Sequence, residues 1–224
     1  MHIYIVGKGK LASELLSGLP PLLSQPVQPW PPAAGTSAPA IVIHAGSGRN
    51  LPEVMAHCRA TQSVLVELST GSAVEQGEPG FPVVLCPNTH ILMLKFMHML
   101  AHSGALFKDC RITITESHQA DKTSTPGTAV AMAESLGLSA SDIVSVRDPE
   151  VQARDLHIPE AHLGRHAFHR ITLEDQGCHI TLETRLHGAT PYADGVARIV
   201  AAILQHPLAP GVHAVQTFVA KGWL

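Results

Sequence analysis

The amino-acid sequence predicts an α/β protein: a Rossmann-type parallel sheet domain, followed by an α+β domain whose sheet is mixed. Three observations lead to this fold class. The first apolar strand, residues 3–6, runs at once into a glycine turn and a helix. Short apolar segments then alternate with helical patterns as far as residue 86, which is typical of a parallel sheet. From residue 111 onward the expected strands are longer, and the last two are joined by a hairpin turn, which indicates a more antiparallel, mixed sheet.

Four apolar runs supply the strands of the parallel sheet. They cover residues 3–6, 40–45, 64–68 and 82–86, and a helix is expected over residues 51–61. The segment between the first two runs, residues 20–39, is rich in proline, which breaks helices and cannot donate a hydrogen bond in a central strand. We therefore expect an irregular loop there, with room for a short edge strand.

The remaining elements form a second domain and complete the first. A long amphipathic helix is expected after Pro87-Asn88-Thr89, ending at about residue 106. Strands are expected over residues 111–116, 143–147, 166–174 and 178–187, helices over 127–137 and 192–205, and a strand or docked tail over 212–219. Gln176-Gly177 has the composition of a hairpin turn. One domain thus comprises residues 1–88 and 191–224, and the other comprises residues 89–190.

The composition argues against several classes of partner. The chain has 224 residues and a formal net charge of −3, so it lacks the basic footprint of a nucleic-acid-binding protein. No stretch approaches the roughly 18 apolar residues of a membrane helix, and the N-terminus shows no secretory signal pattern. The four cysteines lie far apart and form no CxxC pair, which predicts reduced thiols in a cytoplasmic protein rather than a structural zinc site.

The turn after the first strand has the pattern of a dinucleotide-binding loop. Its residues read G-x-G-x-x-A, and glycines allow a pyrophosphate to approach the backbone at the start of a helix. We expect the following residues of this turn to contact the dinucleotide: Gly7, Lys8, Gly9, Lys10 and Leu11. The alternative is a purely structural turn, because glycine pairs are common in turns.

The residue that selects between NADH and NADPH is not evident from the sequence. An acidic residue about 20 positions after the glycine turn usually binds the ribose hydroxyls, but no Asp or Glu lies between Glu14 and Glu53. The proline-rich loop also contains no Arg or Lys for a 2′-phosphate. Lys8, Lys10 and Arg49 are left as candidates for this contact, so the sequence admits either cofactor.

A second group of polar residues follows the strand that begins at residue 111. Glu116, His118, Gln119 and Lys122 precede Pro126-Gly127-Thr128, which opens an alanine-rich helix. A histidine and a lysine can donate protons, and N–H groups at a helix N-terminus can bind a carboxylate. Taken singly, these residues can also be a solvated loop lysine and a helix cap. Their joint spacing favours an active-site loop.

This stretch resembles the signature of bacterial dihydrodipicolinate reductases, which reads E-x-H-H-x-x-K and then P-S-G-T-A. Further segments resemble that family in the same order along the chain. They are Gly7 to Ala12 (the nucleotide loop), Ser69-Thr70-Gly71 (T-T-G in the family), Cys86-Pro87-Asn88 (A-x-N-F-S) and Leu186 to Ala189 (H-x-A). The resemblance covers nearly the whole chain at low identity.

The resemblance implies the reduction of a cyclic imine dicarboxylate by NADH or NADPH. The simplest such activity is the 4-hydroxy-tetrahydrodipicolinate reductase reaction of lysine (diaminopimelate) biosynthesis. The resemblance makes His118 and Lys122 catalytic, and it places Gln119, Lys122, Gly127 and Thr128 at the substrate. It adds three residues to the cofactor site, namely Ser69, Thr70 and Asn88.

The resemblance also assigns a role to each domain. Residues 1–88 with 191–224 would bind the dinucleotide. Residues 89–190 would bind the substrate and join the subunits of a homo-oligomer, which is commonly a tetramer in this family. The expected partners are therefore a small imine and further copies of this chain, with neither nucleic acid nor membrane.

The chain departs from the family pattern at four positions. The second histidine is Gln119, which can donate a hydrogen bond to a carboxylate but carries no positive charge. The serine of P-S-G-T is missing, the usual arginine after Ala189 is absent, and Thr89 replaces the phenylalanine of N-F-S. Two alternatives follow: a reductase of another small cyclic imine, or a non-catalytic nucleotide-binding protein on a decayed reductase fold. The intact His118 and Lys122 argue against decay.

Other histidines are also candidates for function. His44 ends a strand in the nucleotide domain, where it lies near the expected cofactor or serves as a structural histidine. Four more are close together in the sequence, namely His157, His162, His166 and His169. They have no helical spacing with a carboxylate partner, so we expect surface strand positions and no metal site.

Overall fold

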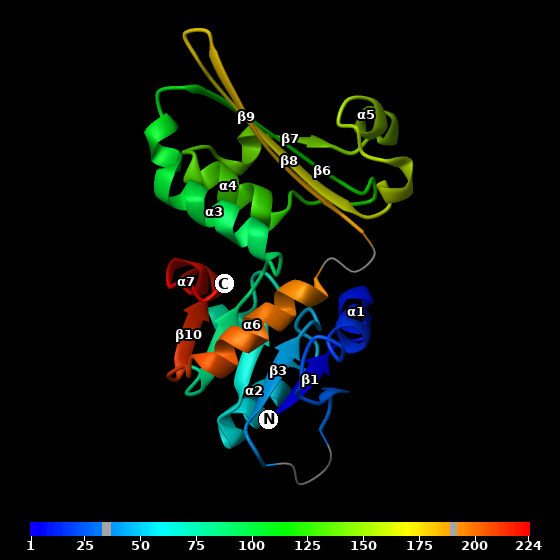
Figure 1. The fold of residues 1–224 in the computed structure, drawn as a ribbon, viewed down its shortest axis with the longest axis vertical. Helices are drawn as coiled ribbons and strands as arrows, with labels where there is room; N and C mark the ends of the chain where they lie inside the picture. The colour runs from blue at the N-terminus through cyan, green and yellow to red at the C-terminus, as the bar shows by residue number, and fades with distance from the viewer. Residues whose placement is uncertain (33–36, 189–191) are drawn as a thin grey trace. The chain divides into compact units, whose positions relative to one another are not determined.

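The computed structural model describes residues 1–32, 37–188 and 192–224. The chain divides into two compact units, one formed by residues 1–94 together with 192–224 and the other by residues 95–191 (Figure 1). The arginine that is usual in the family is absent after Ala189. The segment from Ala189 to Pro191 lies outside the described residues.

The first unit is built on a six-stranded sheet in the order β10-β5-β4-β3-β1-β2. Its strands are β1 (His2–Val6), β2 (Val27–Pro29), β3 (Ala40–His44), β4 (Val64–Glu67), β5 (Pro82–Leu85) and β10 (Gly211–Ala214). Every pairing in this sheet is parallel. The predicted Rossmann-type parallel sheet is therefore confirmed, and the carboxyl ends of β1, β3 and β4 lie at one edge.

Both faces of this sheet are buried. Alternate residues of a strand point to opposite faces, and each face packs in an apolar cluster of its own. In β1, Ile3 and Ile5 belong to one apolar cluster, whereas Tyr4 and Val6 belong to another. The first cluster includes residues of α1 (Lys10–Gly18), α6 (Ala193–Gln205), α7 (Val215–Ala220) and the first turn of α3 (Ile91–Ser103). The second cluster includes residues of α2 (Leu51–Thr61). Burial on both faces explains why these strands read as continuous apolar runs.

Two expectations for this unit have different outcomes. The short edge strand in the proline-rich segment is present as β2, which pairs with β1 at the end of the sheet. The expectation of a strand or docked tail over residues 212–219 was partly wrong, because β10 ends at Ala214 and α7 follows. Val215 and Phe218 are both buried at helical spacing, so the helical period was present in the sequence.

The second unit holds a four-stranded mixed sheet in the order β7-β6-β8-β9. Its strands are β6 (Arg111–His118), β7 (Ile143–Val146), β8 (His166–Asp175) and β9 (Cys178–His187). β6 pairs with β7 in parallel and with β8 antiparallel, and β8 pairs antiparallel with β9. Gln176 and Gly177 have φ of 42° and 85° and join β8 to β9, so the predicted hairpin turn is confirmed.

Helices accompany the mixed sheet as well. They are α3 (Ile91–Ser103), whose first residues belong to the first unit, α4 (Gly127–Ser135) and α5 (Pro149–Arg154). α5 was not predicted from the sequence. Asp148 caps it by accepting a hydrogen bond from the N–H of Glu150 at 2.8 Å, and proline occupies its first turn.

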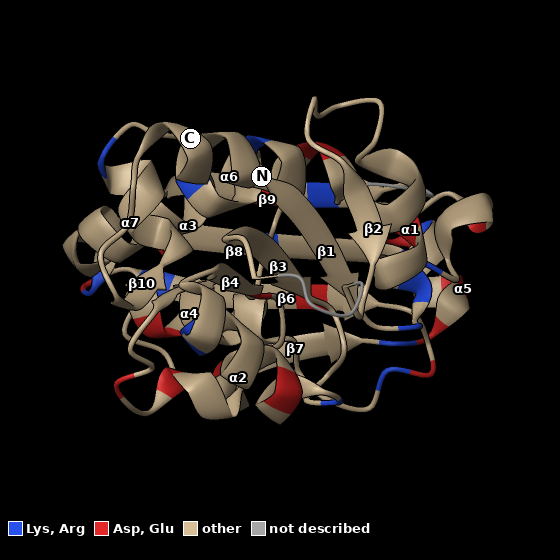
Figure 2. Ribbon diagram, turned by 90° about the horizontal axis from the view of Figure 1, so that it is seen from below, with Lys and Arg blue, Asp and Glu red and all other residues tan. Residues whose placement is uncertain are grey.

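Charged residues are sparse in both units. Figure 2 shows them as short, scattered segments of both signs on an otherwise uncharged ribbon, in keeping with a charged fraction of 15%. Among the described residues, no helix has the length and apolar character needed to cross a membrane.

Candidate functional site

The glycine turn after β1 contains two glycines with different surroundings. Gly7 has φ of +134°, and a Cβ there would stand 2.5 Å from the carbonyl oxygen of Ala45. Gly9 has φ of −85° and precedes α1, and a Cβ there would meet nothing within 4 Å. Gly7 is thus required by the fold, whereas the space beside Gly9 is free for a ligand at the N-terminus of α1.

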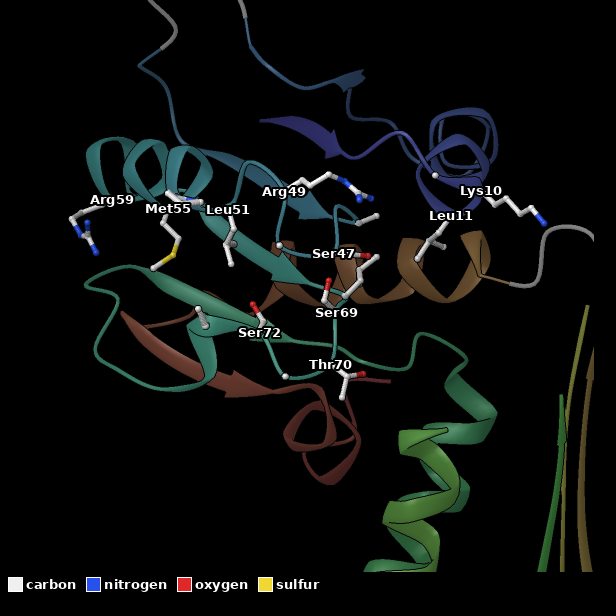
Figure 3. A pocket seen from close by; sticks show the side chains of 17 residues that line it. Lys10, Leu11, Ser47, Arg49, Leu51, Met55, Arg59, Ser69, Thr70 and Ser72 are labelled. Carbon is white, nitrogen blue, oxygen red and sulfur yellow. The ribbon is translucent and has the colours of Figure 1, made fainter. Parts of the chain in front are cut away.

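A cavity of about 890 Å³ lies at the carboxyl ends of β1, β3 and β4, and Figure 3 shows the side chains that line it. In a parallel α/β sheet this edge is where ligands usually bind. Five of the predicted cofactor residues line the cavity: Gly9, Lys10, Leu11, Ser69 and Thr70. The structure thus brings the glycine turn and the Ser69-Thr70 turn to one cavity.

The other predicted cofactor residues lie elsewhere. Gly7 packs against Ala45 beneath the turn, and the side chain of Lys8 is exposed without lining the cavity. Asn88 leads into α3, where its Oδ1 accepts a hydrogen bond from the N–H of His90 at 2.9 Å.

Sequence reasoning missed the side of the cavity formed by α2 and the loop before it. These lining residues include Ser47, Gly48, Leu51, Met55 and Arg59. Their position in the sequence could have indicated them, because the loop and the helix that carry them follow the carboxyl end of a central parallel strand, where ligands usually bind. Figure 3 shows Arg59 at one end of the cavity and Lys10 at the other, with Arg49 between them. No Asp or Glu is among the described residues that line it.

His44 lies beneath this cavity in a buried ion pair. Its Nδ1 is 3.0 Å from Oε1 and 2.9 Å from Oε2 of Glu67, and its Nε2 is 2.8 Å from the carbonyl oxygen of Arg49. Both partners can only accept hydrogen bonds, so both ring nitrogens carry hydrogen and the ring is an imidazolium. Glu67 also accepts the N–H of Ser69 at 2.8 Å. The pair therefore holds two of the loops that line the cavity.

The pKa values of the pair agree with this geometry. Burial acts to lower the pKa of His44, but the hydrogen bonds to Glu67 and to the Arg49 carbonyl outweigh it, and the pKa is raised above 6.5. Burial acts to raise the pKa of Glu67, but the bonds from His44 and Ser69 outweigh it, and the pKa is lowered. With both ring nitrogens occupied, His44 is a structural histidine rather than a proton donor to a ligand.

In the second unit, Glu116 and His118 form another such pair at the end of β6. Glu116 is fully buried, and its Oε2 is 2.8 Å from Nδ1 of His118. Burial acts to raise the pKa of Glu116, but hydrogen bonds from His118, Arg147 and Ser145 outweigh it and lower the pKa to about 2. Because this ionised carboxylate only accepts, Nδ1 of His118 carries the hydrogen. The described residues supply no partner to its Nε2, and the side chain is 14% exposed.

Two further histidines flank the ring of His118. His166 lies with its ring centroid 6.5 Å away, and His169 lies at 5.8 Å. Burial, followed by the charge of His118, lowers the pKa of His169 to about 4. Burial also lowers the pKa of His166, whose Nε2 is 2.9 Å from Oγ of Ser117. Both flanking rings are therefore neutral near pH 7.

The loop after β6 carries the remaining predicted residues. Lys122 closes a turn by donating its N–H to the Gln119 carbonyl at 3.0 Å, and its ammonium makes no ion pair among the described residues. Gly127 and Thr128 open α4, whose N-cap is Pro126 and has no side-chain cap. A hollow of about 500 Å³ lies beside the loop, lined in part by Gln119 and Gln152.

Two of the histidines considered as metal ligands, His166 and His169, lie in the same region. Throughout the described ranges, no group of three or more His, Cys, Asp and Glu side chains is arranged to hold a metal ion. Contrary to expectation, His166 and His169 of β8 are buried rather than at the surface. Nε2 of His166 lies 2.9 Å from Oγ of Ser117, and Nδ1 of His169 lies 3.0 Å from Oγ1 of Thr184.

Fold and site together define a class of protein: a two-unit α/β protein with a Rossmann-type sheet and a ligand cavity at the carboxyl ends of its strands. The particular family follows from comparison with known proteins. A family model described as dihydrodipicolinate reductase, C-terminus, matches residues 91–218. That is more than half of the chain, so the chain belongs to the dihydrodipicolinate reductase family, and the resemblance is confirmed.

Plant proteins are among the relatives that it matches. The chain is 35% identical over 114 residues to the probable 4-hydroxy-tetrahydrodipicolinate reductase 2, chloroplastic, of Oryza sativa subsp. japonica, covering 47% of this chain and 35% of that one. It is 33% identical over 119 residues to the 4-hydroxy-tetrahydrodipicolinate reductase 1, chloroplastic, of Arabidopsis thaliana, covering 49% and 34%. The chain thus spans about a third of the length of these curated relatives.

Solved structures share this fold over nearly all of the chain. A dipicolinate-bound dihydrodipicolinate reductase from Paenisporosarcina sp. TG-14 superposes with a TM-score of 0.67 and 15% identity, covering 97% of this chain and 99% of that one. A probable dehydrogenase from Thermotoga maritima reaches a TM-score of 0.53 at 8% identity, covering 95% and 91%.

Proposed function

We propose that this protein reduces a cyclic imine or enamine with NADH or NADPH, most simply as a 4-hydroxy-tetrahydrodipicolinate reductase of lysine biosynthesis. The observation that carries the proposal is the pair at the end of β6. Glu116 holds Nδ1 of His118, and the described residues leave its Nε2 without a partner, in a chain that belongs to this reductase family. A histidine held in this way can give a proton to a substrate.

The proposed reaction needs both a hydride and a proton. NADH or NADPH, when bound, would supply the hydride for the unsaturated ring system, and the reduced ring would then need a proton. His118 and Lys122 are the proposed donors of that proton, and the donor would then be reprotonated from solvent. N–H groups at the start of α4, at Gly127 and Thr128, would hold a substrate carboxylate.

The nucleotide would occupy the cavity of the first unit. Gly9, Lys10 and Leu11 would meet the pyrophosphate at the N-terminus of α1. Ser69 and Thr70 would line the opposite wall. The lining cations and the absence of a lining carboxylate among the described residues favour an anionic ligand of this kind.

Gln119 favours a second candidate substrate, a cyclic imine with fewer negative charges. The family has a histidine at this position, and a neutral amide does not balance a second carboxylate. A homotetramer and a cytoplasmic location also belong to the proposal. Four free cysteines support the latter, whereas the plant relatives carry the name chloroplastic.

One assay tests the proposal. NADH and NADPH oxidation is followed with freshly generated 4-hydroxy-tetrahydrodipicolinate and, in parallel, with cyclic imines that bear one carboxylate or none. Turnover that disappears in Lys122→Ala supports the proposal, and the preferred imine identifies the substrate class. Nucleotide binding without turnover on any of these imines would favour the non-catalytic alternative.

A further inference from the structure

We propose that Arg147 is the positioning residue that fixes His118 and Lys122 relative to one another. It would act on His118 through Glu116 and on Lys122 through the backbone carbonyl. Arg147 lies outside the sequence motif, directly after β7. The inference rests on the proposed function, because it concerns how the two proposed proton donors of that site are held.

Each nitrogen of the Arg147 guanidinium donates a hydrogen bond. Its Nε donates to the carbonyl oxygen of Lys122 at 2.9 Å. Its Nη2 donates to Oε1 of Glu116 at 2.5 Å, and its Nη1 lies 3.2 Å from Oε2 of Glu116 and 3.0 Å from the carbonyl oxygen of Val146. One planar group thus joins the buried carboxylate of β6, the end of β7 and the loop that bears Lys122.

The carboxylate of Glu116 also contacts His118, and it thereby connects the Arg147 guanidinium to the imidazole. Oε2 of Glu116 accepts from both Arg147 and Nδ1 of His118, so the guanidinium sets the carboxylate plane against which the imidazole is oriented. Gln152 fastens the backbone at the same place, because its Nε2 donates to the carbonyl oxygen of His118 at 2.7 Å. The ring is therefore held at one nitrogen and at its own main chain.

Arginine suits this position and lysine does not. A guanidinium presents a rigid fork of donors that can bind a carboxylate and a separate carbonyl at once, whereas an ammonium is a point charge on a flexible stem. Arg147→Lys can keep the ion pair with Glu116 but loses the geometry that also holds Lys122. This substitution therefore separates the charge of Arg147 from its positioning effect.

The competing interpretation is that Arg147 serves only the stability of the fold. A matched control is available in the same sheet, where Arg170 of β8 pairs with Glu183 of β9 at 2.8 Å. This pair is also an arginine–glutamate contact, and it touches neither His118 nor Lys122. A purely structural role would give Arg147→Lys and Arg170→Gln the same kcat per folded molecule.

The first measurement is steady-state kinetics on the full chain with the imine that the assay of the proposed function selects. We expect Arg147→Lys to lower kcat by about tenfold to a hundredfold, the usual effect of a displacement near 1 Å. The KM for the nucleotide should stay at the wild-type value, and Arg170→Gln should keep the wild-type kcat. A wild-type kcat in Arg147→Lys, or an equal loss in both variants, would overturn the proposal.

The second measurement does not depend on turnover. Nitrogen-15 NMR of the histidine rings, with His118 assigned from a His118→Gln spectrum, reports the state of Nδ1 and Nε2. For the neutral His118 ring we expect the Nδ1–H tautomer in the wild type, altered ring signals in Arg147→Met, mixed tautomers in Glu116→Gln, and no change in Arg170→Gln. If no imine is reduced, the proposed function fails, and this spectrum still decides on Arg147: unchanged His118 signals in Arg147→Met would refute its role.

Discussion

Each unit of this chain contains a buried glutamate that binds a histidine, and the two pairs differ at one ring nitrogen. In the first unit, His44 is fully buried, and both nitrogens face acceptors, Glu67 and the Arg49 carbonyl. In the second unit, His118 gives only Nδ1 to Glu116, and its Nε2 has no partner among the described residues. The same two residue types thus make a structural clamp in one place and, in the other, a half-buried ring that we propose as a proton donor.

The comparison shows what distinguishes a structural from a chemical histidine. An imidazolium with both N–H groups occupied cannot release a proton without breaking a buried ion pair. A ring held at one nitrogen has a fixed orientation, and its other nitrogen is available for proton transfer. The residue type does not separate the two cases. The number of acceptors around the ring does, together with the greater exposure of His118.

The largest effect should follow loss of the proposed proton donors. Lys122→Ala and His118→Gln should each lower kcat by about 10²- to 10⁴-fold, because a positioned acid is removed. Nucleotide affinity should stay near the wild-type value, since neither residue lines the cavity of the first unit. Steady-state rates together with calorimetric nucleotide titration measure both quantities. Nearly full turnover in Lys122→Ala would show that the loop after β6 is not the active site.

His44→Gln should instead affect the free energy of unfolding. It leaves the buried carboxylate of Glu67 without its cation, a loss that typically costs about 3–5 kcal/mol. Urea unfolding of His44→Gln and His118→Gln compares the two pairs directly. We expect a large loss only in the former, and equal losses in the two variants would remove the distinction between clamp and proton donor.

Acid titration should reveal the contribution of Glu116 to stability. Its pKa is lowered from 4.5 to about 2. The resulting stability, on the order of 3 kcal/mol, is fully present above pH 4.5 and is lost as the pH falls through the folded pKa of about 2. Urea unfolding across this range should show a shallower pH dependence in Glu116→Gln than in the wild type. Identical slopes would mean that the carboxylate is not held in the ionised form.

Much of this arrangement was predictable from local patterns, and the part that was not depends on contacts between distant residues. The strand runs and the G-x-G-x-x-A turn identified the parallel sheet, because strands buried on both faces read as continuous apolar runs. Arg147 gave no signal, since it reaches Glu116 only after β7 has paired with β6. The two acceptors of His44 likewise come together only when β3 and β4 lie side by side.

The glycine turn offers a comparison at the cavity of the first unit. Gly9→Val places its side chain in open space at the N-terminus of α1, where it should exclude the pyrophosphate and lower nucleotide affinity at least tenfold (about 1.4 kcal/mol). Gly7→Val should destabilise the fold itself, because its Cβ would collide with the Ala45 carbonyl and its φ is positive. Thermal unfolding with calorimetric titration separates the two. Wild-type affinity in a folded Gly9→Val variant would make the motif a structural turn.

The discrimination between NADH and NADPH should be modest. The cavity contains neither an acidic clamp for the ribose hydroxyls nor a tight basic pocket among its described residues. Both cofactors should therefore bind within about a hundredfold of each other, roughly 2.7 kcal/mol. Calorimetric titration of the wild type measures this ratio, and a larger preference would reveal a specific ribose contact that the lining residues do not account for.

Arg49 is the cation best placed to cause the remaining preference. Arg59 already donates to the Pro79 carbonyl at 3.2 Å, whereas the guanidinium of Arg49 makes no ion pair among the described residues and lies between the two ends of the cavity. Arg49→Gln should weaken NADPH binding by about 0.5–1 kcal/mol, as expected of an accessible charge pair, and should leave NADH nearly unchanged. Arg59→Gln is the matched control. If Arg49→Gln weakened NADH and NADPH equally, Arg49 would bind a phosphate that both cofactors share, and the 2′-phosphate would have to be recognised by another cation such as Lys10.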